Sequence, residues 1–138
     1  MFSKIYLDTS PIIYFLENSP DYALKVQSVI QDNAVLGCAF ATSVATNIEY
    51  LPKPISEGKH DLVYAFSSLK RILSLESIEL TEQISMIAVN LRAKYKGLKV
   101  LDSIHIASAI ASGCDAFFTN DKQLKQLTEL SIIYLSDL

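Results

Sequence analysis

The chain of 138 residues contains only two cysteines, Cys38 and Cys114. Two cysteines are too few for a disulfide framework or a zinc cluster, and both lie in apolar surroundings. We therefore expect reduced thiols in a buried core. The chain also lacks a basic excess, since 12 Lys and Arg stand against 15 Asp and Glu, a formal net charge of -3. At first sight this charge argues against a nucleic-acid ligand, which usually requires a basic surface.

No hydrophobic run is long enough for a membrane span or an export signal. The longest, residues 34–41, is too short to cross a bilayer and predicts a buried strand. The first, residues 5–7, ends at Asp8, far short of the apolar core of a signal peptide. We therefore expect a cytoplasmic protein without membrane contact. The length is that of one domain, residues 1–138, with enough buried surface to fold without disulfides.

Short apolar runs alternate with amphipathic helical stretches, and the sequence contains no repeat or low-complexity tract. Strands separated by helices predict an α/β fold in which a parallel sheet carries helices on both faces. Pro52 and Pro54 predict a loop that lasts through Gly58. The predicted strands are residues 4–7, 35–40, 75–80, 115–119 and 132–135, and the predicted helices are residues 11–17, 21–31, 44–51, 60–73, 82–96, 104–111 and 121–127.

Four acidic residues stand at the carboxyl ends of predicted strands or on the helices that follow them. In a parallel sheet these ends meet at one edge, where the sites of α/β proteins lie. Each acid is flanked by apolar residues, so its carboxylate is costly to bury without a compensating cation. The four acids are Asp8, Glu49, Asp102 and Asp121.

Helix capping is the alternative explanation for Asp8, Asp102 and Asp121, since Asp after a loop commonly caps a helix. Capping does not explain Glu49, which lies within a predicted helix. Four carboxylates at one edge repel one another unless divalent cations are present. Hard oxygen ligands suit Mg²⁺ or Mn²⁺, and such ions activate water and stabilise charge on a phosphate. The acids therefore favour metal-assisted hydrolysis of phosphodiester bonds.

At these residues the sequence resembles the PIN domain family, and in particular the VapC-type toxins of bacterial toxin–antitoxin systems. The opening LDTSPIIYFLE is similar to the family's first motif, in which Asp8 precedes a small hydroxyl residue and an apolar helix. Glu49 matches the second motif. The segment LDSIHIASAIASGCDAFFTND resembles the third and fourth motifs, with Asp102 and Asp121 at the expected spacing. The resemblance covers the whole chain, and LDSIHIASA followed by FTND is its most specific part.

The resemblance implies a three-layer α/β/α sandwich with a parallel sheet of about five strands. It implies a metal-dependent endoribonuclease that hydrolyses RNA with one or two Mg²⁺ or Mn²⁺ ions. A cognate antitoxin and a second copy in a homodimer are the implied protein partners. A catalytically inactive PIN-like module that binds RNA or protein is the alternative. The implied catalytic and metal-binding residues are Asp8, Glu49, Asp102 and Asp121, with Thr9 and Thr119 implied as supporting residues that hydrogen-bond the carboxylates or the scissile phosphate.

Lysines near the acids are candidate contacts for an RNA backbone. Two of them follow the Glu49 helix and three precede Asp102, although the dipole at a helix carboxyl end also explains the second group. These lysines are Lys53, Lys59, Lys94, Lys96 and Lys99. His105 stands one helical turn after Asp102, and we expect a packed or hydrogen-bonded structural residue. Asp115 stands at the amino end of its predicted strand, so we expect it at the opposite edge from the site.

The apolar residues 12–16 exceed what one helix needs to bury. Core packing explains them, and a partner surface for a second copy or an antitoxin helix is the alternative. The net charge of -3 can also be explained by the proposed site, because its four acids account for the whole excess of acidic over basic residues. The charge is therefore no argument against RNA, and RNA binding is expected to depend on metal and on local basic patches.

Overall fold

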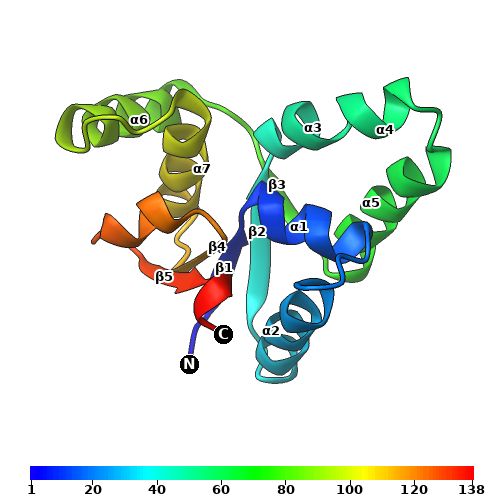
Figure 1. The fold of residues 1–138 in the computed structure, drawn as a ribbon. Coiled ribbons are helices and arrows are strands. Elements are labelled where there is room, and N and C mark those ends of the chain that lie inside the picture. Colours follow the sequence, from blue (N-terminus) through cyan, green and yellow to red (C-terminus); the bar gives the residue numbers. More distant parts are fainter.

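The computed structural model describes all 138 residues and contains one sheet of five parallel strands (Figure 1). The strand order is β3-β2-β1-β4-β5, so β1 lies at the centre of the sheet. Every neighbouring pair is parallel, which confirms the parallel sheet predicted from the alternation of strands and helices. The strands are β1 (Lys4–Leu7), β2 (Ala39–Ser43), β3 (Glu76–Ile78), β4 (Ala116–Thr119) and β5 (Ser131–Tyr134).

Helices cover both faces of the sheet, which confirms the α/β fold and its three layers. Figure 1 shows α6 and α7 on one side of the sheet, and α1, α2 and α5 on the other. No helix is both long and apolar enough to cross a membrane. The helices are α1 (Thr9–Leu16), α2 (Ala23–Val35), α3 (Ala45–Tyr50), α4 (Pro52–Ser56), α5 (His60–Ile72), α6 (Glu82–Lys94) and α7 (Val100–Ala111), with 3₁₀ turns η1 (Lys122–Gln126) and η2 (Leu135–Asp137).

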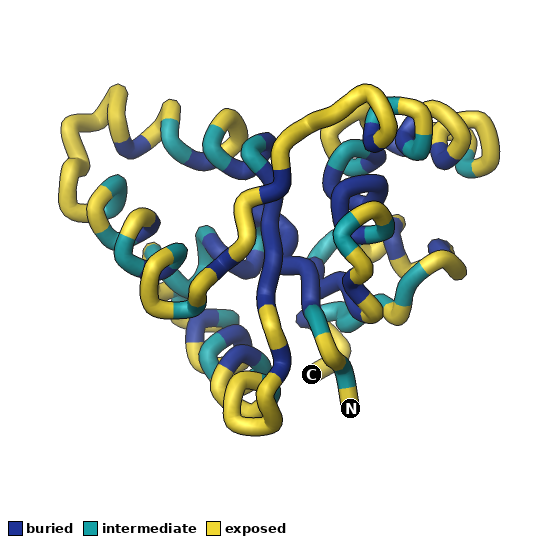
Figure 2. Tube along the Cα trace, turned by 180° about the vertical axis from the view of Figure 1, so that it is seen from behind, coloured by how far each residue is buried: buried dark blue, intermediate teal, exposed yellow.

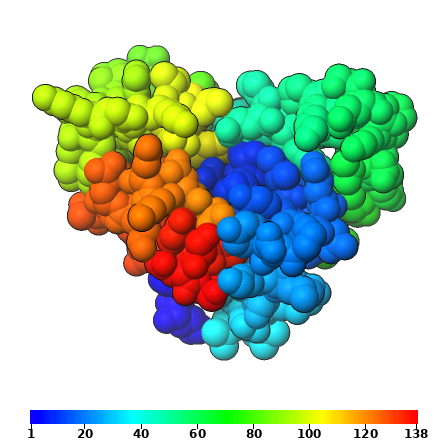
Figure 3. All heavy atoms as spheres, viewed as in Figure 1, coloured from blue at the N-terminus to red at the C-terminus, as the bar shows by residue number.

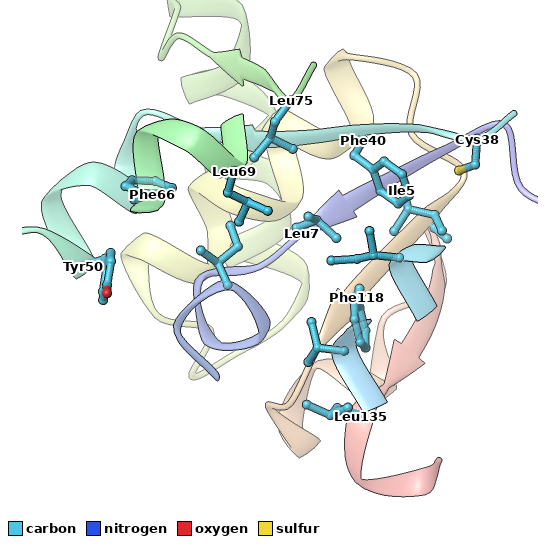
Figure 4. Packing of buried hydrophobic residues seen from close by; sticks show 14 residues of the cluster. Ile5, Leu7, Cys38, Phe40, Tyr50, Phe66, Leu69, Leu75, Phe118 and Leu135 are labelled. Atoms are coloured by element: carbon cyan, nitrogen blue, oxygen red, sulfur yellow. The ribbon is translucent and has the colours of Figure 1, made fainter. Parts of the chain in front are cut away.

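The strands send alternate side chains into two separate cores, as the period of two along a strand requires. In β1, Ile5 and Leu7 join the core beneath α1, α2 and α5, which Figure 4 shows, whereas Tyr6 joins the core beneath α6 and α7. In β4, Phe118 enters the first core and Phe117 the second, where its ring stacks on Tyr6. Figure 2 shows the consequence, a buried sheet centre enclosed by helices with exposed outer faces.

The second strand begins later than the sequence predicted. Residues 35–40 were expected to form it, but Val35 is the last residue of α2 and 85% exposed, and β2 begins at Ala39. Gly37 separates the two elements, because its φ of +85° ends the helix with a bond from the Cys38 N–H to the Asn33 carbonyl. The apolar run 34–41 is therefore split between an exposed helix end and a buried strand.

The predicted loop at residues 52–58 is also wrong, since Pro52–Ser56 forms the short helix α4. Pro52 is its first residue, and a proline in a first helical turn costs no hydrogen bond because the N–H there has no partner. Similarly, α7 begins at Val100, four residues before the predicted start, so Asp102 lies in its first turn and does not cap it. The cysteines are confirmed as free and buried.

Candidate active site

The strand order creates a topological switch point between β1 and β4. The chain proceeds from β1 outward to β2 and β3, and then returns to β4 on the other side of β1. Ligands of α/β proteins bind at such a point, beyond the carboxyl ends of the strands. Asp8 follows β1 and Asp121 follows β4 by two residues, so both stand at this point. The space-filling view shows this edge hollowed between the α7 side and the α3 side, with the start of α1 at the base (Figure 3).

Asp8 is the most deeply buried acid of the chain, with 7% of its surface exposed. Its Oδ1 accepts the Thr9 N–H at 2.9 Å, which makes Asp8 the N-cap of α1. Its Oδ2 accepts the Thr119 hydroxyl at 2.7 Å. Burial nevertheless raises the pKa of the carboxyl, against the charge of His105 and these two hydrogen bonds, which lower it. The residue therefore caps a helix, yet its buried charge is not fully compensated.

Asp102 lies in the first turn of α7, and its pKa is raised to about 6. Burial is the largest cause, followed by the negative charges of Asp8 and Asp121. Because these charges act on Asp102 from two other segments, the fold has brought the three carboxylates near enough to influence one another's ionisation. Lys99 and His105 oppose the effect without cancelling it.

Asp121 is joined to Asp8 through one hydroxyl group. The Asp121 N–H donates to Thr119 Oγ1 at 3.0 Å, while that hydroxyl donates to Asp8. The Asp121 carboxylate also accepts the Gln123 N–H at 3.0 Å and so caps η1. Capping and site membership, which were alternatives for Asp8 and Asp121 in the sequence, thus coexist in the structure.

Glu49 approaches the same place from α3, where a buried histidine holds it. Its Oε1 accepts the Thr9 hydroxyl at 2.8 Å and the Nε2–H of His105. Burial would raise the pKa of Glu49, but the hydrogen bond and charge of His105 outweigh it, so the pKa is lowered. The Glu49 side chain stays 26% exposed.

His105 belongs to a buried chain of polar groups. Its Nδ1 lies 2.5 Å from the Tyr6 hydroxyl, and only 1% of the residue is exposed. Burial lowers the pKa of the imidazole, but the hydrogen bond to Glu49 and the charges of Asp8, Glu49 and Asp102 prevail, and its pKa is raised. The expected packed, hydrogen-bonded histidine is confirmed.

The sequence did not show what His105 contacts. Glu49 is 56 residues away and Tyr6 is 99 residues away, so neither partner is visible as a motif. An ionisable residue in the otherwise uncharged stretch of α7, three positions after Asp102, was the available signal. Thr46 was also missed, and its hydroxyl lies 3.2 Å from that of Thr9.

The five candidate lysines fall into two groups. Two form ion pairs with glutamates, Lys59 with Glu57 and Lys94 with Glu129, and the other three have no acidic partner. Lys99 is the N-cap residue of α7, and its charge acts on Asp102. Asp115 lies at the opposite edge as expected, where it accepts the Ser3 and Lys4 N–H groups. The lysines without partners are Lys53, Lys96 and Lys99.

The donor chemistry of this site fits a hard divalent cation. Carboxylate oxygens are the ligands that Mg²⁺ prefers, and Mg²⁺ is usually bound by one or two carboxylates together with water. No three acid, histidine or cysteine side chains stand close enough together to hold an ion. Glu49 is turned toward His105, whereas Asp8 and Asp102 are left with raised pKa values that an adjacent cation would lower.

Replacing Asp102 with Asn is expected to stabilise the metal-free protein at neutral pH. The pKa of about 6 in the folded state exceeds the ordinary 3.8. The stabilisation by the bound proton is therefore full below about pH 4 and lost as the pH rises through about 6. Asn cannot ionise, so D102N should melt up to about 4 °C above wild type at pH 7.5 in EDTA. At pH 4 the two should melt together.

Thermal unfolding followed by circular dichroism makes this comparison, with Asp21→Asn, an exposed acid outside the site, as the control. A lower melting temperature for D102N than for wild type at pH 7.5 would show that Asp102 is not under repulsion.

Replacing His105 with Ala is expected to raise the pKa of Glu49. The substitution removes the donor and the positive charge that lower this pKa, while part of the burial that raises it stays. His105→Gln should give a smaller rise, because its amide can still donate to the carboxylate. Carboxyl ¹³C NMR titration measures the value, and His60→Ala, at the exposed start of α5, is the control. An unchanged Glu49 pKa in H105A would contradict the contact.

Comparison with known proteins agrees with this fold. The chain is similar to VapBC2 from Rickettsia felis bound to a promoter DNA fragment, with 19% identity over 95% of this chain and 98% of the other and a TM-score of 0.71. DNA-bound VapBC from Salmonella typhimurium matches with 18% identity over 96% and 98% and a TM-score of 0.72. A toxin–antitoxin complex from Klebsiella pneumoniae matches with 18% identity over 94% and 95% and a TM-score of 0.64.

At such identities these likenesses show the fold alone. No match was found among curated protein sequences. The sequence pattern of the PIN domain matches residues 5–130, which includes all four site acids and nearly the whole chain. The chain therefore belongs to the PIN domain family.

Proposed function

We propose that this PIN domain is a metal-dependent endoribonuclease and the toxin of a type II toxin–antitoxin system. One observation supports the enzymatic part: the carboxylates of Asp8, Asp102 and Asp121 come from separate segments and lie near enough at the sheet's switch point for their charges to interact, and the pKa of two of them is raised. A cap or a surface acid does not need this arrangement, since it destabilises the protein in the absence of a cation. PIN domains are typically nucleases, which agrees with the arrangement.

Asp8 and Asp102 would hold a Mg²⁺ or Mn²⁺ ion in the proposed site. When bound, the ion supplies a water of lowered pKa and stabilises negative charge on the phosphate. The remaining work belongs to the chain's own residues. Thr119 and the Thr9 N–H orient the Asp8 carboxylate, and Asp121 adds a third negative group at the rim. Glu49, held through one oxygen by Thr9 and His105, keeps its second oxygen for a water or an ion.

Substituting either central acid is expected to abolish RNA cleavage. Asp8→Asn and Asp102→Asn each remove one negatively charged metal ligand. Loss of a residue that only hydrogen-bonds a metal ligand typically lowers activity by about 10- to 100-fold, so loss of a ligand itself should lower the cleavage rate by more than about 100-fold. Circular dichroism should show an intact fold. Glu17→Gln, which changes an exposed acid on the loop after α1, should cleave as wild type does. A purified D8N or D102N protein that cleaves RNA at the wild-type rate would refute the site.

The affinity of the site for a metal ion is expected to depend on pH. Asp102 must lose its proton to bind a cation, and its pKa is about 6. Calorimetry should therefore show Mn²⁺ affinity falling as the pH drops through about 6. A wild-type protein that binds RNA but binds no Mn²⁺ at pH 7.5 would support the inactive binding module in place of the enzyme.

The proposed antitoxin partner has a surface that suits it. An apolar groove of about 590 Å³ lies between α1, α2 and α5. Phe15 and Leu16 line it from α1, so part of the apolar segment 12–16 is available to contact a partner in addition to packing in the core. Tyr64 and Ile72 line it from α5 and are 69% and 75% exposed. An apolar face of a partner helix fits such a groove. The similar VapBC structures are toxin–antitoxin complexes, which supports this partner. The homodimer stays a prediction from the resemblance to the PIN family.

Charged residues in the groove are expected to weaken antitoxin binding. Tyr64→Glu with Ile72→Glu changes exposed side chains, so folding should be preserved. Affinity for the protein encoded by a small neighbouring reading frame should fall more than about 10-fold by calorimetry, because charge in an apolar contact is poorly solvated. Met86→Glu, an exposed apolar residue on α6, is the control. Unchanged affinity would exclude the groove, and lost self-association would make it the homodimer face.

A further inference from the structure

A second hollow lies outside the carboxylate cluster and has the opposite character. Its volume is about 450 Å³, and it lies between the segment that follows α6 and the 3₁₀ turn η1. In Figure 3, the orange spheres of η1 border the yellow-green spheres of the segment between α6 and α7. Gly97 makes the turn that brings the two segments together, with a φ of +85°. The hollow is lined by Lys96, Gly97, Leu98, Lys122, Gln123 and Gln126.

The lysines of this hollow have uncompensated charges. Neither Lys96 nor Lys122 has an acidic partner or another hydrogen bond, and no acid lines the hollow. Neighbouring lysines differ, because Lys94 pairs with Glu129 at 3.0 Å and Lys125 with Asp137 at 2.7 Å. The side-chain amides of Gln123 and Gln126 add neutral donors. Two unpaired ammonium groups with amide donors form a surface for an anion.

The two segments of the hollow lead directly to the proposed active site. Lys122 follows Asp121, whose N–H shares the Thr119 hydroxyl with Asp8. On the other side, residues 96–98 precede Lys99, whose charge acts on Asp102. A chain molecule with a phosphate at the carboxylates would therefore carry its neighbouring groups past this hollow.

We propose that this hollow binds a backbone phosphate of single-stranded RNA next to the phosphate that is cleaved. The proposal rests on the proposed function and names where the substrate's backbone lies. Lysine binds phosphate as a point charge, and phosphate contacts position a nucleic acid without reading its sequence. The hollow has no aromatic side chain on which a base could stack, so the backbone is the part that it recognises. The carboxylates repel RNA without metal, which gives an adjacent cationic contact a purpose.

The experiment compares two doubly substituted full-length proteins of equal net charge. K96Q/K122Q removes both ammonium groups of the hollow, whereas K25Q/K125Q removes one exposed lysine from α2 and the paired lysine of η1. Binding of a fluorescein-labelled single-stranded RNA is measured by anisotropy in EDTA, which prevents cleavage, from 20 to 200 mM NaCl. The slope of log K against log[NaCl] should become shallower by about 0.7 for each phosphate that K96Q/K122Q no longer neutralises. K25Q/K125Q should keep the wild-type slope.

Cleavage and metal binding then separate this proposal from the function on which it rests. With Mg²⁺, K96Q/K122Q should raise KM for RNA and leave kcat and Mn²⁺ affinity unchanged, since a remote contact binds ground and transition states alike. An unchanged slope in K96Q/K122Q, or equal slopes in the two double variants, would overturn the proposal that the hollow binds RNA. Cleavage of RNA by the wild-type protein would still support the proposed nuclease activity. If K96Q/K122Q loses antitoxin binding but keeps its RNA binding, the hollow is a protein contact and the RNA proposal is overturned. Weakened RNA binding in a chain without nuclease activity supports the hollow and rejects the nuclease.

Discussion

The repulsion among carboxylates at the switch point is the constraint on which the rest of the site depends. Asp8 is buried and Asp102 is half-buried, and the charges of Asp8 and Asp121 add to the cost of ionising Asp102. Without a cation the protein carries this cost as a raised pKa. Helix capping alone does not account for this cost, whereas the proposed metal-dependent reaction would, because a bound cation would favour the ionised carboxylates.

Hydroxyl and imidazole groups limit that repulsion without removing it. Thr119 and Thr9 hydrogen-bond Asp8 and Glu49, and His105 holds Glu49 from within the core beneath α6 and α7. Tyr6 completes this chain from the central strand. Each of these partners stands on a different element, so the relative placement of β1, α1, β4 and α7 is what orients the carboxylates. The positive charges at the rim, Lys96 and Lys122, stay outside this network.

Much of the fold could be predicted because it depends on local pattern. The short apolar runs of β1 and β4 and the helical stripes between the strands were enough to predict a parallel α/β sheet. The predicted element boundaries were wrong where a residue type is compatible with more than one kind of secondary structure. Val35 is apolar but ends an exposed helix, and Pro52 begins a helix that it was expected to prevent. In both cases the backbone hydrogen bonds decide, and composition alone does not show them.

The acids of the site could be placed from the ends of strands, but their partners could not. The contact of His105 with Glu49 and the pairing of Lys94 with Glu129 join residues far apart in the sequence. Only the packed fold shows which histidine orients an acid and which lysines keep an available charge.

The most direct test of the central claim is anomalous diffraction from crystals soaked in Mn²⁺. We predict an ion in contact with the carboxylates of Asp8 and Asp102. An occupied Mn²⁺ site elsewhere, with neither carboxylate as a ligand, would contradict it.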